Sequence, residues 1–318
     1  MKLILSLAIV AAMLATANGI EPDEVPGHLQ KIAVTVKTDR TSGSGTILAR
    51  EIEGKTYAFI LTAHHVIDDL RRVTTRIEVG KEYKEVRYDK CKVTQERVID
   101  GATVGEQTLY CSVIATSPKY DIAALLVLWP DKFTEEETLE FLDALPPVGK
   151  EVFHCGSPSG QQLGHNSLTE GIIAAQWRMF DELPYTQTTV SALPGSSGGM
   201  VVDRETGEYV GMLTLGITNT DSFNYIVPSR RIVKWAKAIG FEYLVNSEAK
   251  ALDFDEISDL PIESVVKRAT SKSDVNGYET GGYISRAERE AMLAEQGFNL
   301  WIKHEDAPTL AVPDPSIR

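Results

Sequence analysis

Short strand-like runs recur along this chain from about residue 32 to residue 227, and Gly, Pro or polar turn residues separate them. Many short strands with turn signals between them are typical of a β-sandwich or of β-barrels. We therefore expect an all-β fold. The strands are expected at residues 32–37, 45–49, 57–62, 83–93, 107–115, 122–128, 151–155, 172–176, 186–191, 200–202, 209–215 and 224–227.

Two helices are expected among the strands. Residues 134–144 carry acidic side chains at their start, which helix N-termini favour. The second helix follows Pro228, where Ser229 can act as the cap and apolar residues up to Ile239 form one face before Gly240.

The composition and charge exclude several classes of protein. Apolar residues make up 43% of the 318 residues and charged residues 24%, as in an ordinary soluble domain. The net charge of −13 repels phosphate backbones, so no nucleic-acid partner is expected. No run of 18 apolar residues follows the N-terminus, which argues against stable membrane insertion.

Residues 1–17 have the features of a signal peptide. Lys2 is followed by an apolar run at residues 3–14 that is too short to span a bilayer, and Ala15-Thr16-Ala17 fits a cleavage site before Asn18. The alternative is an uncleaved membrane anchor. We expect cleavage, a linker at residues 18–30 and a secreted or periplasmic protein, whose compartment allows disulfides.

The chain has three cysteines. Cys91 and Cys111 lie in two expected strands joined by a turn with Gly101 and Gly105, and a hairpin could bring them together. We expect a disulfide between them, and a buried free thiol at Cys155.

The character of the sequence changes near the end of the main domain, which we place at residues 31–245. Residues 246–318 are expected to be an acidic, partly disordered extension. Within it, a capping box at residues 285–288 predicts one short helix that ends near Gly297.

Three segments carry the parts of a nucleophilic triad in the order His, Asp, Ser. A serine oxygen needs a neutral imidazole to take its proton, and a buried carboxylate to orient that imidazole. Glycines around a serine let backbone N–H groups converge on the negative oxygen of a tetrahedral intermediate. The segments are Thr-Ala-His-His-Val at residues 62–66, Asp-Ile-Ala-Ala-Leu at residues 121–125, and Pro-Gly-Ser-Ser-Gly-Gly at residues 194–199.

With these motifs the chain resembles the chymotrypsin-fold serine proteases, closest to their HtrA branch, from about residue 32 to residue 240. Gly-Ser-Gly-Thr-Ile at residues 43–47, Gly-Ser-Pro at 156–158, Thr-Glu-Gly-Ile-Ile at 169–173 and Asn-Tyr-Ile-Val-Pro-Ser at 224–229 add to the resemblance. The resemblance implies two six-stranded antiparallel β-barrels followed by a C-terminal helix. It also implies a serine endopeptidase that acts on proteins or peptides.

The resemblance assigns the catalytic roles to His65 rather than His64, to Asp121 and to Ser197. The N–H groups of Gly195 and Ser197 would form the oxyanion hole. In the same interval, Asp89 and Asp100 are the acidic alternatives to Asp121.

The resemblance also locates a primary substrate pocket. The residue six before the nucleophile is Ser191, and the facing segment includes Thr214, Leu215 and Gly216. No acidic residue stands at these positions, so we expect a small or medium apolar P1 residue rather than Lys or Arg.

The sequence departs from the HtrA pattern, and other interpretations stay open. Residues 248–318 show no PDZ pattern, so regulation and assembly known for the branch are not expected to carry over, and the oligomeric state stays open. A catalytically silent module for binding or adhesion is the non-enzymatic alternative. An α/β-hydrolase is a further alternative, but that fold needs the order Ser, acid, His, whereas the motifs of this chain run in the order His, Asp, Ser. His154 beside Cys155 lacks a third ligand at suitable spacing, so no metal or cofactor is expected.

Overall fold

The structure is a computed structural model. It describes residues 20–263 except 79–80, 100–101, 131, 135–136, 159–165, 181–182 and 217–222. The expected signal peptide, the expected helix at residues 285–296 and most of the acidic extension lie outside the described residues.

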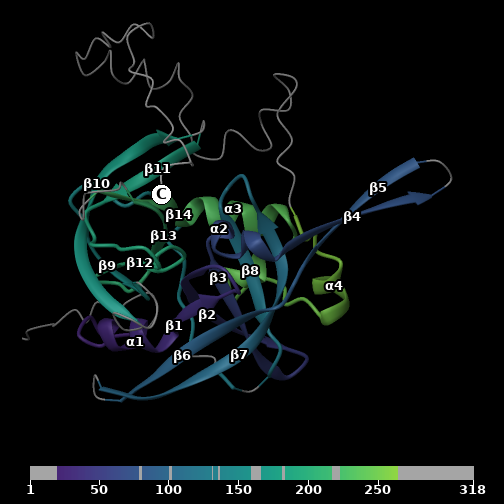
Figure 1. The fold of residues 1–318 in the computed structure, drawn as a ribbon. Helices are drawn as coiled ribbons and strands as arrows, with labels where there is room; N and C mark the ends of the chain where they lie inside the picture. Colours follow the sequence, from purple (N-terminus) through teal and green to yellow (C-terminus); the bar gives the residue numbers. More distant parts are fainter. Residues whose placement is uncertain are drawn as a thin grey trace, which may run out of the picture. The chain divides into compact units, whose positions relative to one another are not determined.

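Two closed six-stranded antiparallel barrels form the fold, as expected from the sequence (Figure 1). Closing a sheet into a barrel leaves no exposed edge strand. The first barrel contains β1 (Ala33–Lys37), β2 (Ser42–Ile52), β3 (Lys55–Thr62), β6 (Cys91–Ile99), β7 (Ala102–Ser117) and β8 (Ile122–Val127). The second contains β9 (Glu151–Gly156), β10 (Ser167–Phe180), β11 (Leu183–Thr188), β12 (Met200–Asp203), β13 (Tyr209–Gly216) and β14 (Asn224–Pro228).

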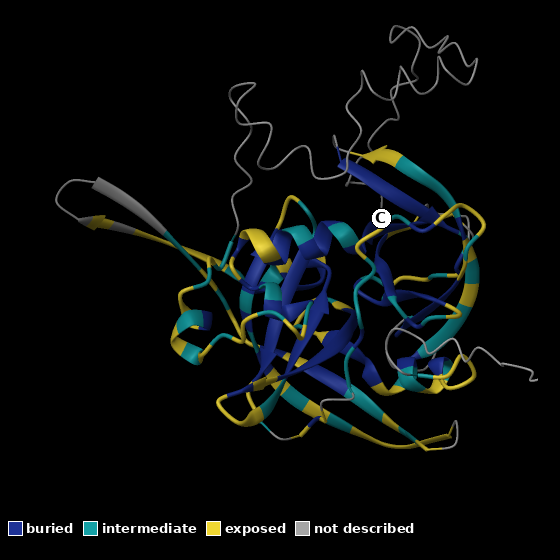
Figure 2. Cartoon of the chain, turned by 180° about the vertical axis from the view of Figure 1, so that it is seen from behind, coloured by how far each residue is buried: buried dark blue, intermediate teal, exposed yellow. Residues whose placement is uncertain are grey.

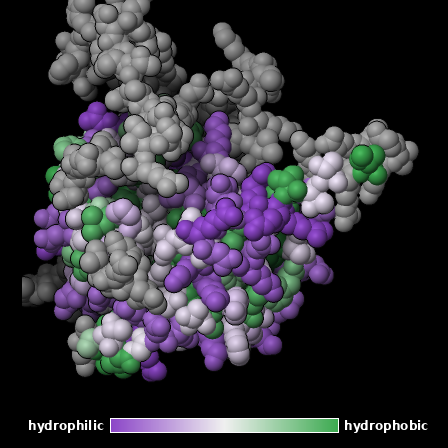
Figure 3. All heavy atoms as spheres, in the orientation of Figure 1, coloured by the Kyte–Doolittle hydropathy of each residue, from purple (hydrophilic) through white to green (hydrophobic). Residues whose placement is uncertain are grey.

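Most of the barrel strands bury most of their residues, drawn in dark blue in Figure 2, whereas β6, β7 and β10 are largely half-buried or exposed. Every residue of β8 and β14 is buried, which explains why these segments are almost continuously apolar in the sequence. Hydrophilic side chains cover much of the described surface in Figure 3, with apolar ones scattered between them. None of the helices that the structure describes is long and apolar enough to cross a membrane.

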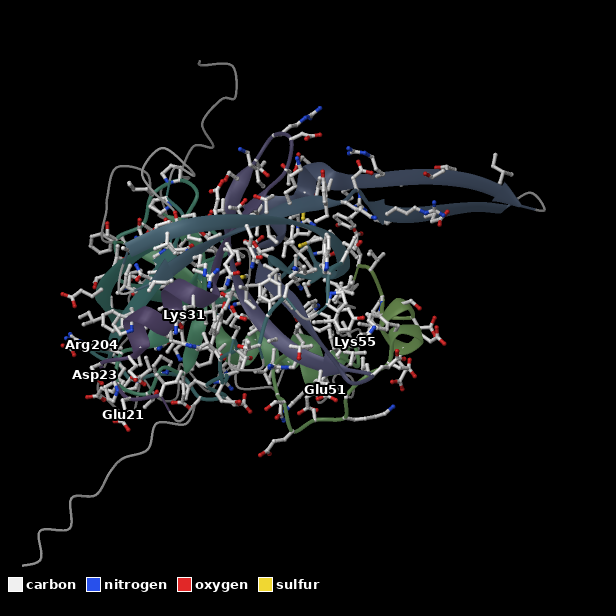
Figure 4. All side chains as sticks on the ribbon, turned by 90° about the horizontal axis from the view of Figure 1, so that it is seen from below. Glu21, Asp23, Lys31, Glu51, Lys55 and Arg204 are labelled. Atoms are coloured by element: carbon white, nitrogen blue, oxygen red, sulfur yellow. The ribbon has the colours of Figure 1, made fainter. Side chains whose placement is uncertain are left out.

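A separate hairpin extends from the first barrel and is not part of it (Figures 1 and 4). It consists of β4 (Arg71–Glu78) and β5 (Lys81–Tyr88). The sequence did not indicate β4, and it joined β5 and β6 into one run at residues 83–93. The structure breaks that run at Asp89 and Lys90, where the chain passes from the hairpin to the barrel.

The helix expected at residues 134–144 is absent from the described part of that segment, so this prediction was wrong. The backbone of the segment bonds to strands β2 and β13 of the two barrels instead. Ala49 N–H donates to Glu137 O at 2.9 Å, and Tyr209 N–H donates to Glu140 O at 2.8 Å. Phe141 stacks on Tyr209 with ring centroids 4.5 Å apart. These tertiary contacts replace the hydrogen bonds that a helix would make.

Residues expected to form a linker instead contain helix α1 (Val25–Ile32). Its residues Val25, Leu29 and Ile32 are buried. Pro26 occupies the first turn, where the missing N–H costs nothing. The apolar spacing of three or four residues was present in the sequence, but Pro22 and Pro26 favoured the interpretation as a linker.

The expected terminal helix is α3 (Ser229–Ala238), and its cap differs from the expectation. The N-cap residue is Pro228, and Ser229 lies inside the helix. After α3 the chain returns to the first barrel through the short helix α4 (Phe254–Ser258). There the backbone N–H of Thr116 donates to Ile262 O at 2.8 Å.

The three cysteines are buried and free in the structure, so the expected disulfide is not formed there. Cys91 and Cys111 are nevertheless direct cross-strand partners in β6 and β7. Their side chains share a hydrogen bond. The hairpin therefore brings the two thiols together as expected. Cys155 lies apart from them in β9.

Candidate functional site

The pairing of β3 with β8 brings His65 and Asp121 together. Thr62 at the end of β3 is opposite Ala123 near the start of β8. Helix α2 (His64–Ile67) follows β3, and Asp121 immediately precedes β8. Two segments separated by more than fifty residues of sequence thus meet at one edge of the first barrel.

His65 makes two hydrogen bonds to Asp121. Its backbone N–H donates to Oδ1 at 2.9 Å, and its Nδ1 lies 2.8 Å from Oδ2. An ionised carboxylate only accepts, so Nδ1 carries the proton and Nε2 is left as the proton acceptor. The His65 side chain is 48% exposed and the Asp121 side chain 17% exposed, so the imidazole is accessible above a mostly buried carboxylate.

The electrostatics of this pair favour the charged forms. Burial opposes ionisation of both groups, but the hydrogen bond and charge of Asp121 outweigh it and raise the pKa of His65. Burial likewise acts against ionised Asp121, and the bonds from His65 and Thr214 overcome it and lower the pKa of Asp121. The imidazole is thereby suited to hold a proton that it receives.

Ser197 lies in the loop between β11 and β12, where Gly195 and Gly198 have φ of +99° and +88°. Such angles suit glycine, and they turn the backbone sharply around the serine. The Ser197 hydroxyl donates to Thr214 O at 3.5 Å. Among the described residues it makes no hydrogen bond to His65. The structure therefore brings His65 and Asp121 into hydrogen-bond contact, and leaves Ser197 outside it.

The backbone N–H groups of Gly195 and Ser197 donate no hydrogen bond within the described chain. Other amides of the loop are bonded: Ser196 N–H donates to Leu193 O at 2.9 Å and Gly199 N–H to Ser196 O at 3.0 Å. Two unpaired donors beside a serine could hold a developing negative oxygen.

The alternatives to His65 and Asp121 have other partners. His64 is buried, and its Nε2 lies 3.1 Å from the Tyr88 hydroxyl, away from Asp121. Asp89 is exposed and pairs with Arg72 at 2.7 Å. Asp100 lies outside the described residues.

A depression of about 610 Å³ lies beside His65 and Asp121. Leu215 and the hydroxyl-bearing Thr214 line it, together with three side chains from the β10–β11 hairpin: Phe180, Leu183 and Tyr185. Thr214 is 5% exposed and its hydroxyl donates to Asp121 Oδ2, so its oxygen supports the carboxylate. Ser191 and Gly216 are exposed at the surface.

His154 is a buried neutral histidine. Its Nδ1 lies 2.9 Å from Met200 O, and burial lowers its pKa to about 4. In the described part of the chain, no group of three His, Cys, Asp or Glu side chains could hold a metal ion.

Two functional contacts were missed in the sequence. Thr214 was expected in a substrate pocket, yet its hydroxyl bonds Asp121. Ser44 was noted only as part of a Gly-Ser-Gly motif, yet its hydroxyl donates to Gly195 O at 2.7 Å. Both contacts join the two barrels, and no local sequence signal marks such a contact.

Comparison with known proteins identifies similar sequences. A family model described as a trypsin-like peptidase domain matches residues 43–212, more than half of the chain. The mitochondrial serine protease HTRA2 of Bos taurus is 28% identical over 206 residues, which cover 60% of this chain and 35% of that protein. A probable periplasmic serine endoprotease, DegP-like, of Pseudomonas fulva is 29% identical over 184 residues, covering 57% and 30%.

The chain thus spans about a third of the length of these curated relatives. Among solved structures, the serine endoprotease from Yersinia pestis matches with a TM-score of 0.48 and 20% identity. That match covers 71% of this chain and 67% of the other.

Proposed function

This chain belongs to the family of trypsin-like peptidases, and we propose that it is an exported serine endopeptidase that cleaves peptide bonds through an acyl-enzyme intermediate. The observation that carries the proposal is the double hydrogen bond from His65 to Asp121, next to a serine loop with two unpaired N–H groups. Serine endoproteases among its relatives support the same reaction class.

In the proposed mechanism, Ser197 Oγ attacks the carbonyl carbon of the scissile peptide bond. His65 Nε2 takes the Ser197 proton, and Asp121 holds the resulting imidazolium in place. The N–H groups of Gly195 and Ser197 bind the oxyanion of the tetrahedral intermediate. His65 then gives the proton to the leaving amine, and water repeats the sequence on the acyl-enzyme.

In this mechanism the Ser197 hydroxyl gives up its bond to Thr214 O and donates to His65 Nε2 instead. Catalytic hydrogen bonds are often long or misaligned before a substrate binds, and they tighten in the complex.

The proposed substrates are proteins or peptides with a small or medium apolar P1 residue. Neither Ser191 nor the segment at residues 214–216 offers a carboxylate to a basic side chain. The depression beside His65 is lined by Leu215, Leu183 and Tyr185, which suit apolar side chains of the same peptide, and also by the charged side chains of Asp68 and Lys119.

A catalytically silent module for binding is the second candidate. The absence of a Ser197–His65 hydrogen bond among the described contacts favours it. In that case the folded protein would bind peptides and cleave none.

Labelling with a fluorophosphonate probe and a casein-cleavage assay distinguish the two candidates. An endopeptidase is labelled at Ser197 and degrades casein, and both signals disappear in Ser197→Ala. His65→Ala is expected to lose about as much activity as Ser197→Ala, because the triad acts as a unit.

His64→Ala is the matched control, since it removes the adjacent histidine of the same helix. It is expected to retain most of the activity. Loss of activity in His64→Ala with an active His65→Ala would show that the wrong histidine has been assigned. A folded wild type that is neither labelled nor active would support the binding module.

A further inference from the structure

Ser44 in β2 is fully buried, and its backbone N–H, carbonyl and hydroxyl all form hydrogen bonds with residues outside β2. Its backbone N–H donates to Ser197 O at 2.7 Å, and its hydroxyl donates to Gly195 O at 2.7 Å. The same hydroxyl accepts the Ser157 N–H at 2.7 Å, and its carbonyl accepts the Thr62 hydroxyl at 2.7 Å. One residue of the first barrel therefore holds the serine loop of the second.

The direction of these bonds is fixed by chemistry. A backbone N–H can only donate and a carbonyl can only accept. Because Ser157 N–H occupies the oxygen of the Ser44 hydroxyl, the hydroxyl proton points at Gly195 O.

The two carbonyls that Ser44 holds belong to Gly195 and Ser197, the residues that supply the two unpaired N–H groups. Between them, Ser196 O accepts Gly199 N–H at 3.0 Å. Three successive carbonyls of the loop are thus anchored, two of them by Ser44. Each peptide unit is planar and joins a carbonyl to the N–H of the next residue, so the anchored Ser196 carbonyl fixes the Ser197 N–H. The two units that Ser44 holds lie directly before and after that unit, so Ser44 limits its rotation from both sides.

Strand β2 and the serine loop are packed so closely that the contact leaves no room for a larger residue. A Cβ added to Gly198 would lie 2.2 Å from Ser44 O, and one added to Gly43 would lie 3.0 Å from Ser197 O. The contact continues outward, because Thr35 donates its hydroxyl proton to Ser157 Oγ at 2.7 Å.

We propose that Ser44 is a positioning residue that orders the oxyanion loop for catalysis. The residue before the nucleophile is the neutral Ser196, whose hydroxyl accepts Leu193 N–H at 3.3 Å, so an ion pair at that position does not order the loop. Instead, the hydrogen bonds from Ser44 in the first barrel to Gly195 O and Ser197 O order the loop. This inference rests on the proposed endopeptidase function.

Ser44→Ala tests the proposal in the full-length protein. We expect kcat to fall by about tenfold or more, since loss of an oxyanion donor itself costs about 10²–10³. KM should stay within about twofold, because the loop acts on the transition state. The affinity for a peptide aldehyde, whose hemiacetal oxygen occupies the oxyanion hole, should fall by the same factor as kcat/KM.

Thr46→Val is the matched control. Thr46 lies two residues along the same strand and is equally buried, and no hydrogen bond joins its hydroxyl to the described residues of the serine loop. Removing this hydroxyl should leave kcat and aldehyde affinity unchanged. An equal loss of kcat in Thr46→Val would overturn the proposal, because any buried hydroxyl of β2 would then have the effect.

Ser44→Cys extends the test to a residue of similar size with a weaker donor. It should give a kcat between those of wild type and Ser44→Ala, and it serves if Ser44→Ala does not fold. An unchanged kcat in the folded variants, with an active wild type, overturns this proposal alone. A wild type without Ser197-dependent activity overturns the endopeptidase function and this proposal together.

Discussion

Asp121 receives both hydrogen bonds that His65 can direct toward it, at 2.9 Å from the backbone N–H and at 2.8 Å from Nδ1. Two bonds to one carboxylate fix the position of the ring as well as its tautomer. Asp121 itself has a φ of +56°, a region that non-glycine residues seldom occupy. The two hydrogen bonds to His65 hold the Asp121 carboxylate in this position, and the carboxylate in turn orients the His65 ring.

The pH profile of kcat/KM should have an acid limb above the ordinary histidine value of about 6.5. Asp121 raises the pKa of His65, and His65 must be neutral to take the serine proton. Activity therefore rises as pH increases through this raised pKa. Measuring kcat/KM on a peptide substrate from pH 5 to 9 checks the position of the limb.

Asp121→Asn should move the acid limb to lower pH and reduce kcat by about 10⁴. The amide lacks the charge that raises the pKa of His65, and it can favour the wrong tautomer. Asp89→Asn is the control, since Asp89 pairs with Arg72 at the surface. If the acid limb of the pH profile lay at the same pH in Asp121→Asn and in wild type, the assignment of His65 and Asp121 as the catalytic pair would be wrong.

Cys91 and Cys111 should be oxidised to a disulfide when the protein is purified from an exporting host. They are direct cross-strand partners, and their thiols already contact one another. In the loop-entropy model the bond would add roughly 3 kcal/mol to the free energy of unfolding. Mass mapping of non-reduced peptides identifies the link.

Cys155 is the internal control for this prediction. It is buried, and burial raises the pKa of its thiol, so it should stay reduced and unreactive. A peptide linking Cys155 to either of the other cysteines would contradict the proposed pairing.

The protein starting near Asn18 should be active without further cleavage at the N-terminus. Leu29 and Ile32 are buried in α1, so a new amine at Ile32 would come from dismantling a packed helix. Adding a few residues before Asn18 should leave casein cleavage unchanged. A protein that stays inactive until cut near Ile32 would refute this expectation.

Glu263→Gln should lower the free energy of unfolding by roughly 1 kcal/mol near pH 7. Glu263 accepts Arg71 Nη2–H at 2.9 Å and the Tyr88 hydroxyl at 2.7 Å. The Arg71 bond lowers the pKa of Glu263, so its stabilising effect is present above the usual carboxyl pKa. The difference between wild type and variant should vanish as pH falls through the lowered pKa.

Chemical denaturation at several pH values measures this difference. Glu85→Gln is the matched control, because it removes a glutamate that contacts Arg87 at the surface of the neighbouring strand. It should leave the stability unchanged. An equal loss in both variants would contradict a specific role for Glu263.

The sequence predicted the barrels well because glycine and proline mark their turns locally. Residues 209–215 and 224–227, for example, were expected as strands and form β13 and β14. The expected helix at residues 134–144 failed for the opposite reason. Its propensity was local, but its backbone found partners at Ala49 and Tyr209, far away in the sequence.

In the candidate site, too, the locally encoded features could be predicted and the long-range contacts could not. The motifs around His65 and Asp121 could be identified from neighbouring residues, and β3–β8 pairing brings them together. The supporting hydroxyls of Thr214 and Ser44 reach across from one barrel to the other. Such contacts depend on how the two barrels pack, which no short run of residues encodes.

Helix α1 contacts strands of both barrels, β2 and β6 in the first and β9 and β10 in the second. Gln30 also exchanges hydrogen bonds with Asn166 beside β10, at 3.3 and 3.1 Å. Unfolding of either barrel therefore removes part of the surface on which this helix packs, which couples the stability of the two barrels. Calorimetry should therefore record one heat-absorption peak for the two barrels, rather than a separate peak for each barrel.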